Sequence, residues 1–237
     1  MKTIEILFED GEALVIDKPA GLPVERPRAG GPSLEDHLDT LRLGFQRDPV
    51  PVHRIDTDTS GCLLLARNPK ALKRFSSAFE ARAVTKHYIG LVAGELADDE
   101  GTIALSLSKI SSAEKGWRMI AAKKGKPSVT HWKKLGMKDG VTAVAFAPET
   151  GRTHQIRIHA LAGLGFPLLG DPVYGDGPGR LGGAGRTMLH ASELVVQREG
   201  KEPISAIAPL PTDFARLCPD IAESIEWPAG KEWPAEA

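Results

Sequence analysis

The sequence has 237 residues, of which 41% are hydrophobic and 26% are charged, and its formal net charge is −1. This composition is typical of a folded globular protein and excludes an intrinsically disordered chain. A chain of this length can form one large domain or two small ones, and such a domain buries roughly 70% of the surface of its unfolded chain.

The sequence shows no segment that would direct it to a membrane or out of the cell. Acidic residues interrupt the N-terminal stretch MKTIEILFEDGEALVID, so it lacks the apolar core of a secretion signal. The charge-free segment 160–170 contains three glycines and a proline, and it is far shorter than the roughly 20 residues that span a bilayer. Cys62 and Cys218 have neither the spacing of a zinc site nor the density of a disulfide scaffold. We therefore expect a cytoplasmic protein without a membrane segment.

Three segments have the spacing of apolar residues that predicts an amphipathic α-helix. These segments are residues 34–43, a stretch that begins at Pro69, and residues 152–164. Ser33 and Asn68 directly precede the first two segments, where their side chains can cap a helix N-terminus.

Most of the other segments have the β-branched and aromatic content of strands. Two short strands are expected around the turn at Asp10-Gly11, and a buried strand at 62–66. Further strands are expected at 84–96 and in the segments GTIALSL, SVTHWKKL, VTAVAFAP, TMLHASELVV and PISAIAP, whereas 170–186 is a glycine-rich loop. Because strands are in the majority and do not alternate regularly with helices, the sequence predicts an α+β fold with a largely antiparallel sheet.

Charge is distributed unevenly along the chain. Residues 109–138 contain nine lysines and arginines against one acid, whereas residues 199–237 contain eight acids against three bases. The basic segment is consistent with a polyanion lying across one face, and equally with a solvated hairpin whose lysines prevent aggregation. The tail repeats EWPA at 226–229 and 232–235. We expect its tryptophans to pack the chain end onto the body, with a partner-docking tail as the alternative.

The segment HRIDTDTSG, residues 53–61, concentrates charged and hydroxyl side chains directly before a buried strand. Such charge cannot extend far inward, so we expect a loop that leads into the strand and turns sharply at Gly61. A carboxylate there needs a partner, because burying it alone costs several kcal/mol. Of the two arginines in GRTHQIRIH, Arg157 is the better candidate, since its place in mid-helix fixes its direction. Pairing would keep the acid ionised as a possible nucleophile, although an ion pair with a structural role is the alternative.

Four segments in chain order resemble the signature segments of the RluA family of pseudouridine synthases. They are HRIDTDTSG, TKHYIGLVAG, GRTHQIRIHA and LLGDPVYG. LVIDKPAGLPV and MLHASEL also match, so the resemblance covers roughly residues 10–210. It implies a catalytic domain of the pseudouridine synthase type over residues 1–220, with a mixed, largely antiparallel sheet, flanking helices and a central RNA-binding cleft. Residues 221–237 are then a C-terminal tail.

The resemblance also implies roles for individual side chains. Asp56 corresponds to the catalytic aspartate, which attacks the uracil ring or its ribose so that the base detaches, rotates and rejoins through carbon 5. Arg54 is similar to the arginine that takes the place of the extruded base in the RNA stack. Tyr88 matches the tyrosine that packs on the target uracil and assists removal of the carbon 5 proton. Arg157 matches the basic residue that pairs with the nucleophile.

The implied reaction needs no redox step and no bond to phosphate, so we expect no cofactor and no metal. Short members of the family modify tRNA, or tRNA and large-subunit rRNA, and the implied partner is therefore one of these RNAs. The motifs begin within twenty residues of Met1, so we expect the catalytic domain itself to select the substrate. Ile55 replaces the leucine usual in the motif, a near-isosteric change that should keep the loop seated. We expect a monomer.

Two other classes of function are consistent with parts of the sequence. One is an RNA-binding protein that has lost turnover. The other is a metal-dependent hydrolase built on His53, Asp56, His154, His159 and Asp171. Against the second, His154 and His159 are five residues apart, a poor spacing for two ligands on one helical face. We expect His53 to bond to the backbone, and Asp171 and Tyr174 to fix a turn.

Overall fold

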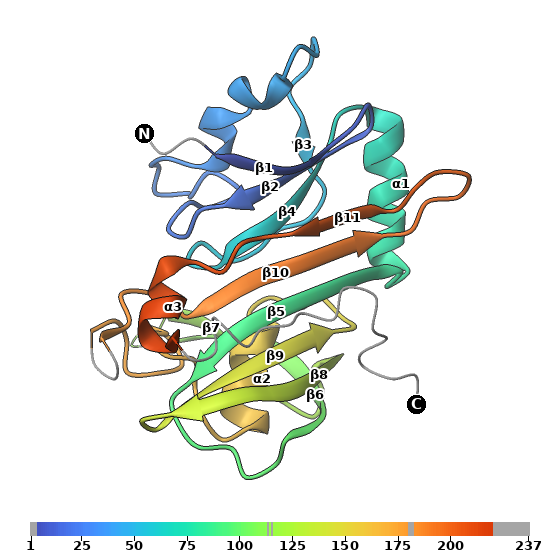
Figure 1. Cartoon of the computed structure of the whole chain (residues 1–237). Helices are drawn as coiled ribbons and strands as arrows, with labels where there is room; N and C mark the ends of the chain where they lie inside the picture. Colours follow the sequence, from blue (N-terminus) through green and yellow to red (C-terminus); the bar gives the residue numbers. More distant parts are fainter. Residues whose placement is uncertain (1–3, 113, 115, 180–182, 220–237) are drawn as a thin grey trace. The chain divides into compact units, whose positions relative to one another are not determined.

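The computed structural model describes residues 4–112, 114, 116–179 and 183–219. The chain divides into two compact units (Figure 1). Unit 1 comprises Met1–Lys86 and His190–Pro209, and unit 2 comprises His87–Leu189 and Leu210–Ala237. The predicted tail, 221–237, lies outside the described residues, so the division into a catalytic domain and a tail stays a prediction.

Unit 1 is built on a mixed sheet with strand order β1-β2-β4-β10, in which β3 also pairs with β4 and β11 with β10 (Figure 1). Only the pairing of β4 with β10 is parallel among these strands. The bounds are β1 Glu5–Glu9, β2 Ala13–Lys18, β3 Val50–Pro51, β4 Ser60–Ala66, β10 Leu189–Val196 and β11 Ile204–Ile207. The predicted turn at Asp10-Gly11 forms because the Asp10 carboxylate accepts hydrogen bonds from the amides of Glu12 and Ala13, both at 2.8 Å.

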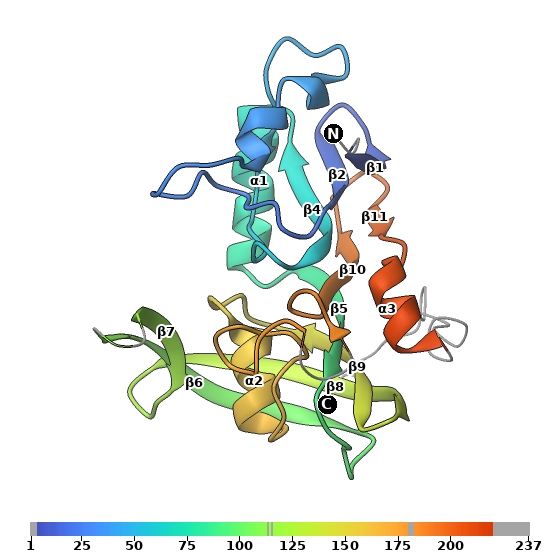
Figure 2. The ribbon, with the colours of Figure 1, turned by 90° about the vertical axis from the view of Figure 1, so that its left-hand side faces the viewer.

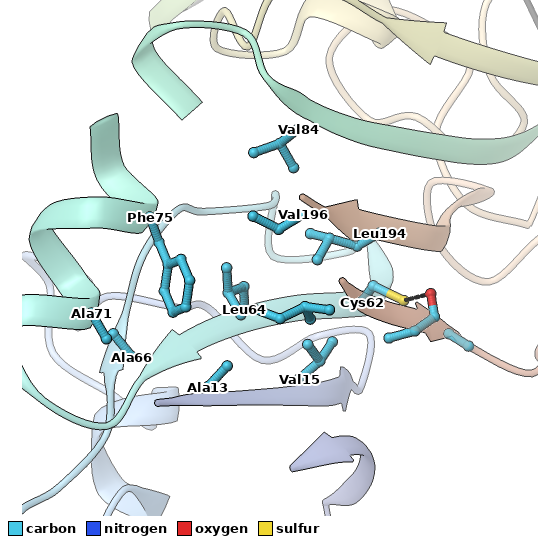
Figure 3. Packing of buried hydrophobic residues seen from close by; sticks show 13 residues of the cluster. Ala13, Val15, Cys62, Leu64, Ala66, Ala71, Phe75, Val84, Leu194 and Val196 are labelled. Atoms are coloured by element: carbon cyan, nitrogen blue, oxygen red, sulfur yellow. Dashed lines mark hydrogen bonds between the residues drawn. The ribbon is translucent and has the colours of Figure 1, made fainter. Parts of the chain in front are cut away.

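Helix α1, Pro69–Glu80, covers one face of this sheet (Figure 3). The Asn68 side chain caps it by accepting a 2.9 Å hydrogen bond from the amide of Ala71, as the sequence predicted. Phe75 points from the helix toward Leu64 of β4, and both are fully buried (Figure 3). Burying a side chain of this size stabilises the fold by about 1.5–3 kcal/mol. The helix therefore holds β4, and with it the loop that precedes β4.

The α-helix predicted over 34–43 is wrong. This segment forms two 3-10 turns, Leu34–His37 and Thr40–Arg42. Local side-chain bonds replace the helical ones between them: the Thr40 hydroxyl donates to the carbonyl of His37, and the Thr40 amide donates to Asp39. Leu43 then adopts a left-handed conformation with φ 49°, which ends the second turn. Leu34 and Leu41 are nevertheless both buried, as their apolar spacing predicts.

Unit 2 is built on an antiparallel sheet with strand order β5-β9-β8-β6-β7 (Figure 2). The bounds are β5 Val84–Val92, β6 Glu100–Ser112, β7 Gly116–Ala121, β8 Lys126–Lys138 and β9 Val141–Pro148. Helix α2, Gln155–Gly163, lies against β6 and β8 and buries Ile156 and Ala160 in a cluster with Trp132 and Phe146. A short helix α3, Thr212–Leu217, adds Phe214 to a second cluster. Neither β7 nor α3 is among the elements that the sequence patterns predict.

The predicted α+β class, with mostly antiparallel strands and a few flanking helices, is confirmed. Both cysteines are buried and free, and burial raises the pKa of the Cys62 thiol to about 12. In the described part of the chain, we find no helix with the length and apolar character needed to cross a bilayer.

Candidate active site

Residues 53–59 of unit 1 form a loop that leads into a buried strand, as predicted, and this strand, β4, begins at Ser60, two residues earlier than expected. Asp56 lies in a turn of this loop, where its backbone carbonyl accepts a 3.1 Å hydrogen bond from the amide of Thr59. The preceding residue, Ile55, is buried and seats the loop on the protein interior. The Asp56 side chain is half-buried. Asp56 is therefore carried on a fixed backbone and is not fully enclosed by the protein.

A fully buried lysine stabilises this loop through hydrogen bonds to backbone carbonyls. The Nζ of Lys18, whose exposed fraction is 0%, donates to the carbonyls of Pro19 and Leu22 at 2.8 Å and of Thr57 at 3.1 Å. The same carbonyl of Thr57 accepts a 2.9 Å bond from the amide of Gly21. An ammonium group can be buried only if its donors find acceptors, and these carbonyls come from two different loops. Lys18 therefore ties the loop after β2 to the loop that carries Asp56.

Lys18 is not among the site residues predicted from the sequence. One signal could have found it: a lysine ends the apolar run ALVIDK directly before a proline. A charged side chain in that position either reaches solvent or satisfies a specific set of buried acceptors.

The other end of the loop is fixed where β4 pairs with β10. Gly61 has φ +105°, and a Cβ at this position would lie 2.1 Å from the carbonyl oxygen of Ala191. Next to it, the buried hydroxyl of Ser60 bonds to Nδ1 of His190 at 2.9 Å. Nε2 of His190 lies 3.3 Å from the carbonyl of Ala208. Ser60 and Gly61 thus hold the end of the loop against β10, Ser60 through a buried side-chain bond and Gly61 through a close approach of the two backbones.

His53 bonds to the backbone, as predicted. Its Nε2 accepts a 3.1 Å hydrogen bond from the amide of Leu64, and its ring stacks on Phe79 with centroids 4.5 Å apart. Burial, together with a smaller effect of the nearby charge of Lys86, lowers the pKa of His53 to about 3. The imidazole is therefore neutral at physiological pH and can accept this bond.

Arg54 lies on the surface of unit 1 and forms an ion pair with Glu25 at 2.8 Å. The two side chains are 67% and 66% exposed, and a pair this exposed contributes only about 0–1 kcal/mol. Arg54 also lines a cavity of about 750 Å³ together with Glu25, Glu35, Asp48 and His53. Arg54 can therefore leave Glu25 at little energetic cost.

Tyr88 and Arg157 belong to unit 2. Tyr88 lies on β5 opposite Phe146 of β9, and its half-buried ring packs against the cluster that contains Ile156. Tyr88 therefore contributes to the core of unit 2 without being fully buried.

The Arg157 guanidinium is held by Asp171. Its Nε and Nη2 donate to the two carboxylate oxygens at 2.7 and 2.8 Å, and the side chains are 8% and 0% exposed. Asp171 also accepts bonds from the amides of Val173 and Tyr174, which confirms the prediction that it fixes a turn. Its second role, as a partner of Arg157, was not predicted from the sequence. The predicted pairing of Arg157 with Asp56 joins residues of different units and stays a prediction.

The histidines proposed as metal ligands are engaged by protein groups. Nε2 of His159 bonds to the Ser128 hydroxyl at 2.8 Å, and burial lowers the pKa of His159 to about 4. Nδ1 of His154 bonds to the Tyr174 hydroxyl at 2.9 Å. Among the residues that the structure describes, no three His, Cys, Asp or Glu side chains are grouped as a metal site would need.

Comparisons with known proteins agree with the family resemblance that the sequence motifs indicate. The family model for RNA pseudouridylate synthase matches residues 12–162. A protein of Zymomonas mobilis named an uncharacterized RNA pseudouridine synthase is 53% identical over 212 residues, which cover 90% of this chain and 96% of that protein. Ribosomal large subunit pseudouridine synthase D of Xanthomonas campestris is 37% identical, over 93% of this chain and 70% of the relative.

Two further similarities bear on the type of enzyme and on the fold. The dual-specificity RNA pseudouridine synthase RluA of Haemophilus ducreyi is 36% identical, over 86% of this chain and 89% of the relative. The solved structure of human RNA pseudouridylate synthase domain containing 1 superposes with a TM-score of 0.71 at 30% identity, covering 90% of this chain and 87% of the human one. This chain therefore belongs to the RNA pseudouridylate synthase family, as an isomerase of the RluA type.

Proposed function

We propose that this protein converts specific uridines of tRNA, large-subunit rRNA or both into pseudouridine, with Asp56 as the nucleophile and without a cofactor. The observation that carries the proposal is the rigid support of the Asp56 loop by buried Lys18 on one side and by the Ser60–His190 bond on the other. The substrate class is supported by the relatives, one named for the large ribosomal subunit and one for dual specificity.

The proposed chemistry is an isomerisation. The bond between N1 of uracil and C1′ of the ribose breaks, and a bond between carbon 5 and C1′ forms. Carbon 5 loses its proton and N1 gains one, so no oxidant or reductant is consumed. Asp56 attacks either the base or the sugar and releases the uracil for rotation. Tyr88 packs on the uracil and assists removal of the carbon 5 proton, and Arg157 keeps the nucleophile ionised.

The target base must first leave the RNA helix, because stacking hides its reactive atoms. Extruding a base costs a few kcal/mol, and a planar cation that fills the gap lowers this cost. We propose Arg54 for this role, in a central cleft where the RNA binds. Its weak, exposed pair with Glu25 supports the proposal, since the guanidinium can exchange one partner for another.

The test is release of tritium from RNA labelled at carbon 5 of uridine, with tRNA and large-subunit rRNA transcripts as substrates. The wild-type protein should release tritium from at least one of them. Asp56→Asn should bind the same RNA and release none, whereas Asp98→Asn, at an exposed aspartate of unit 2, should retain activity. No release from any transcript by the wild-type protein would overturn the proposal. Full activity of Asp56→Asn would remove Asp56 from its role.

We further propose that residues 1–220 form the catalytic domain, with 221–237 as a tail, and that the protein acts as a monomer in the cytoplasm. The match of the family model to residues 12–162 supports the catalytic part of this division. Light scattering of the full chain should give the mass of one copy, 25.4 kDa.

A further inference from the structure

An exposed tryptophan stands at the edge of the unit 2 sheet. Strands β6 and β7 form an antiparallel hairpin in which Trp117 lies opposite Ser111 and Met119 lies opposite Lys109. Strand β7 is the last strand of this sheet and lies beside α2 (Figure 2). The Trp117 side chain is 48% exposed. An indole that is half exposed on an edge strand is accessible to a binding partner.

The surroundings of Trp117 fit a nucleic acid better than an apolar protein surface. The Lys109 ammonium lies 5.0 Å from the centroid of the indole, on the same face of the hairpin. Between Lys109 and Lys126 the sequence carries further positive charges and Glu114 as its only acid. An aromatic face next to cations is the combination that binds single-stranded RNA, because the bases stack on the ring and the phosphates pair with the lysines.

The indole also rests on a residue in a strained conformation. It stacks on His154, with ring centroids 5.1 Å apart and planes inclined by 30°. His154 directly precedes α2 and has φ 53°, in the left-handed region that non-glycine residues rarely adopt. Such strain persists only where the surroundings enforce it, and it gathers at functional sites.

A single hydroxyl connects this stack to Arg157. The Tyr174 hydroxyl bonds to Nδ1 of His154 at 2.9 Å and accepts a 3.0 Å bond from the amide of Met119 on β7. The Arg157 guanidinium lies over the ring of Tyr174, with its Cζ atom 5.0 Å from the ring centroid. Tyr174 therefore joins three elements of unit 2: the β6–β7 hairpin, the start of α2 and the turn that carries Asp171.

We propose that Trp117 is a further substrate-binding residue: an unpaired base of the RNA, outside the target nucleotide, stacks on its indole while Lys109 moves to the adjacent phosphate. Through His154 and Tyr174, this binding steadies Arg157. The inference rests on the proposed function and adds the single-stranded character of the RNA that flanks the target. A duplex would hide the faces of its bases and could not occupy this surface.

The first experiment measures Kd and steady-state kinetics of the full chain on the transcript that gives tritium release. Loss of one stacked base should weaken RNA binding of Trp117→Ala roughly 5- to 150-fold, with a matching rise in KM and a smaller change in kcat. Trp117→Phe should recover most of the affinity, because a ring remains. Lys109→Met should reduce the salt dependence of binding by about one counterion. Met137→Ala, at an equally exposed residue of β8, should bind like the wild type.

The second experiment reads the indole directly. RNA should quench tryptophan emission of the wild-type protein and of Asp56→Asn, and this quenching should be largely absent in Trp117→Phe. Because this measurement uses Trp117→Phe, the inference remains testable if Trp117→Ala fails to fold.

The outcomes separate this inference from the proposed function. Tritium release by the wild type, with Kd and KM unchanged in Trp117→Ala and Trp117→Phe and no quenching, would show that the indole only covers His154, and would overturn the inference. No release from any RNA, together with weaker binding of Trp117→Ala, would support Trp117 as an RNA contact and place the failure in the proposed function.

Discussion

Asp171 divides its carboxylate between Arg157 and the backbone. Each oxygen accepts one guanidinium N–H, at 2.7 and 2.8 Å, and Oδ1 also accepts the amides of Val173 and Tyr174. The same side chain therefore sets the direction of Arg157 on α2 and the shape of the turn that carries Tyr174. This arrangement explains how a helix and a loop 14 residues apart in the chain keep a common geometry.

The first prediction follows from the burial of this pair. Asp171→Ala should lower the free energy of unfolding by about 3–5 kcal/mol, because it leaves the Arg157 charge buried without a partner. Urea denaturation followed by circular dichroism measures the change. Asp213→Ala is the matched control, since Asp213 also holds an arginine through two bonds but is 32% exposed. It should cost clearly less. Equal losses in the two variants would contradict this account.

The second prediction concerns Lys18. Lys18→Met should destabilise the protein by about 3 kcal/mol, because the buried carbonyls of Pro19, Leu22 and Thr57 lose their donor. It should also lower kcat more than it weakens RNA binding, since the Asp56 loop loses its support. Thermal unfolding and single-turnover kinetics check the two effects. Lys70→Met, at an exposed lysine of α1, should change stability by less than about 0.5 kcal/mol. A stable and fully active Lys18→Met variant would refute the role given to this side chain.

The third prediction compares two glycines with positive φ. Gly61→Ala should destabilise the protein by at least about 3 kcal/mol, because the new Cβ would force apart the backbones of β4 and β10. At Gly21, with φ +84°, a Cβ would meet nothing within 4 Å. Gly21→Ala should therefore cost only about 1–2 kcal/mol for the left-handed conformation. Chemical denaturation of both variants gives the comparison, and similar losses would show that the close approach of the strands does not matter.

The fourth prediction is a pH dependence of stability that arises from His53. Its pKa is about 3 in the folded protein and about 6.5 in an unfolded chain. Between these values the unfolded state binds a proton that the folded state does not, so stability falls as the pH is lowered from about 6.5 toward 3. His53 should contribute about 1.4 kcal/mol per pH unit over this range.

His53→Gln should remove this contribution, while its side-chain oxygen still accepts the bond from the amide of Leu64. Unfolding free energies at pH 6.5 and pH 5 should then differ less in the variant than in the wild type. The remaining dependence includes His159, whose pKa is about 4 and whose contribution has the same sign. An NMR titration that places the pKa of His53 near 6.5 would contradict the prediction.

Most helices and strands were predictable from the sequence, because their formation depends on residues that are close together in the chain. Asn68 and Pro69 mark the start of α1, and the continuous apolar run of β4 follows directly after the motif loop. The segment 34–43 shows the limit of such reasoning. Its apolar spacing suits an α-helix and a pair of 3-10 turns equally, and side-chain bonds from Asp39 and Thr40 decided between them.

The sequence by itself determined the α+β class, the order of the motifs and, through them, the family. The tertiary structure decided which groups meet: Lys18 with the carbonyl of Thr57, Arg157 with Asp171, and Trp117 with His154. The physical reason is that periodicity and capping act over a few residues, whereas an ion pair or a ring stack depends on distances that only the packed sheet and helices define. The sequence predicts that a buried arginine such as Arg157 needs a carboxylate partner, but only the tertiary structure shows which carboxylate lies beside it.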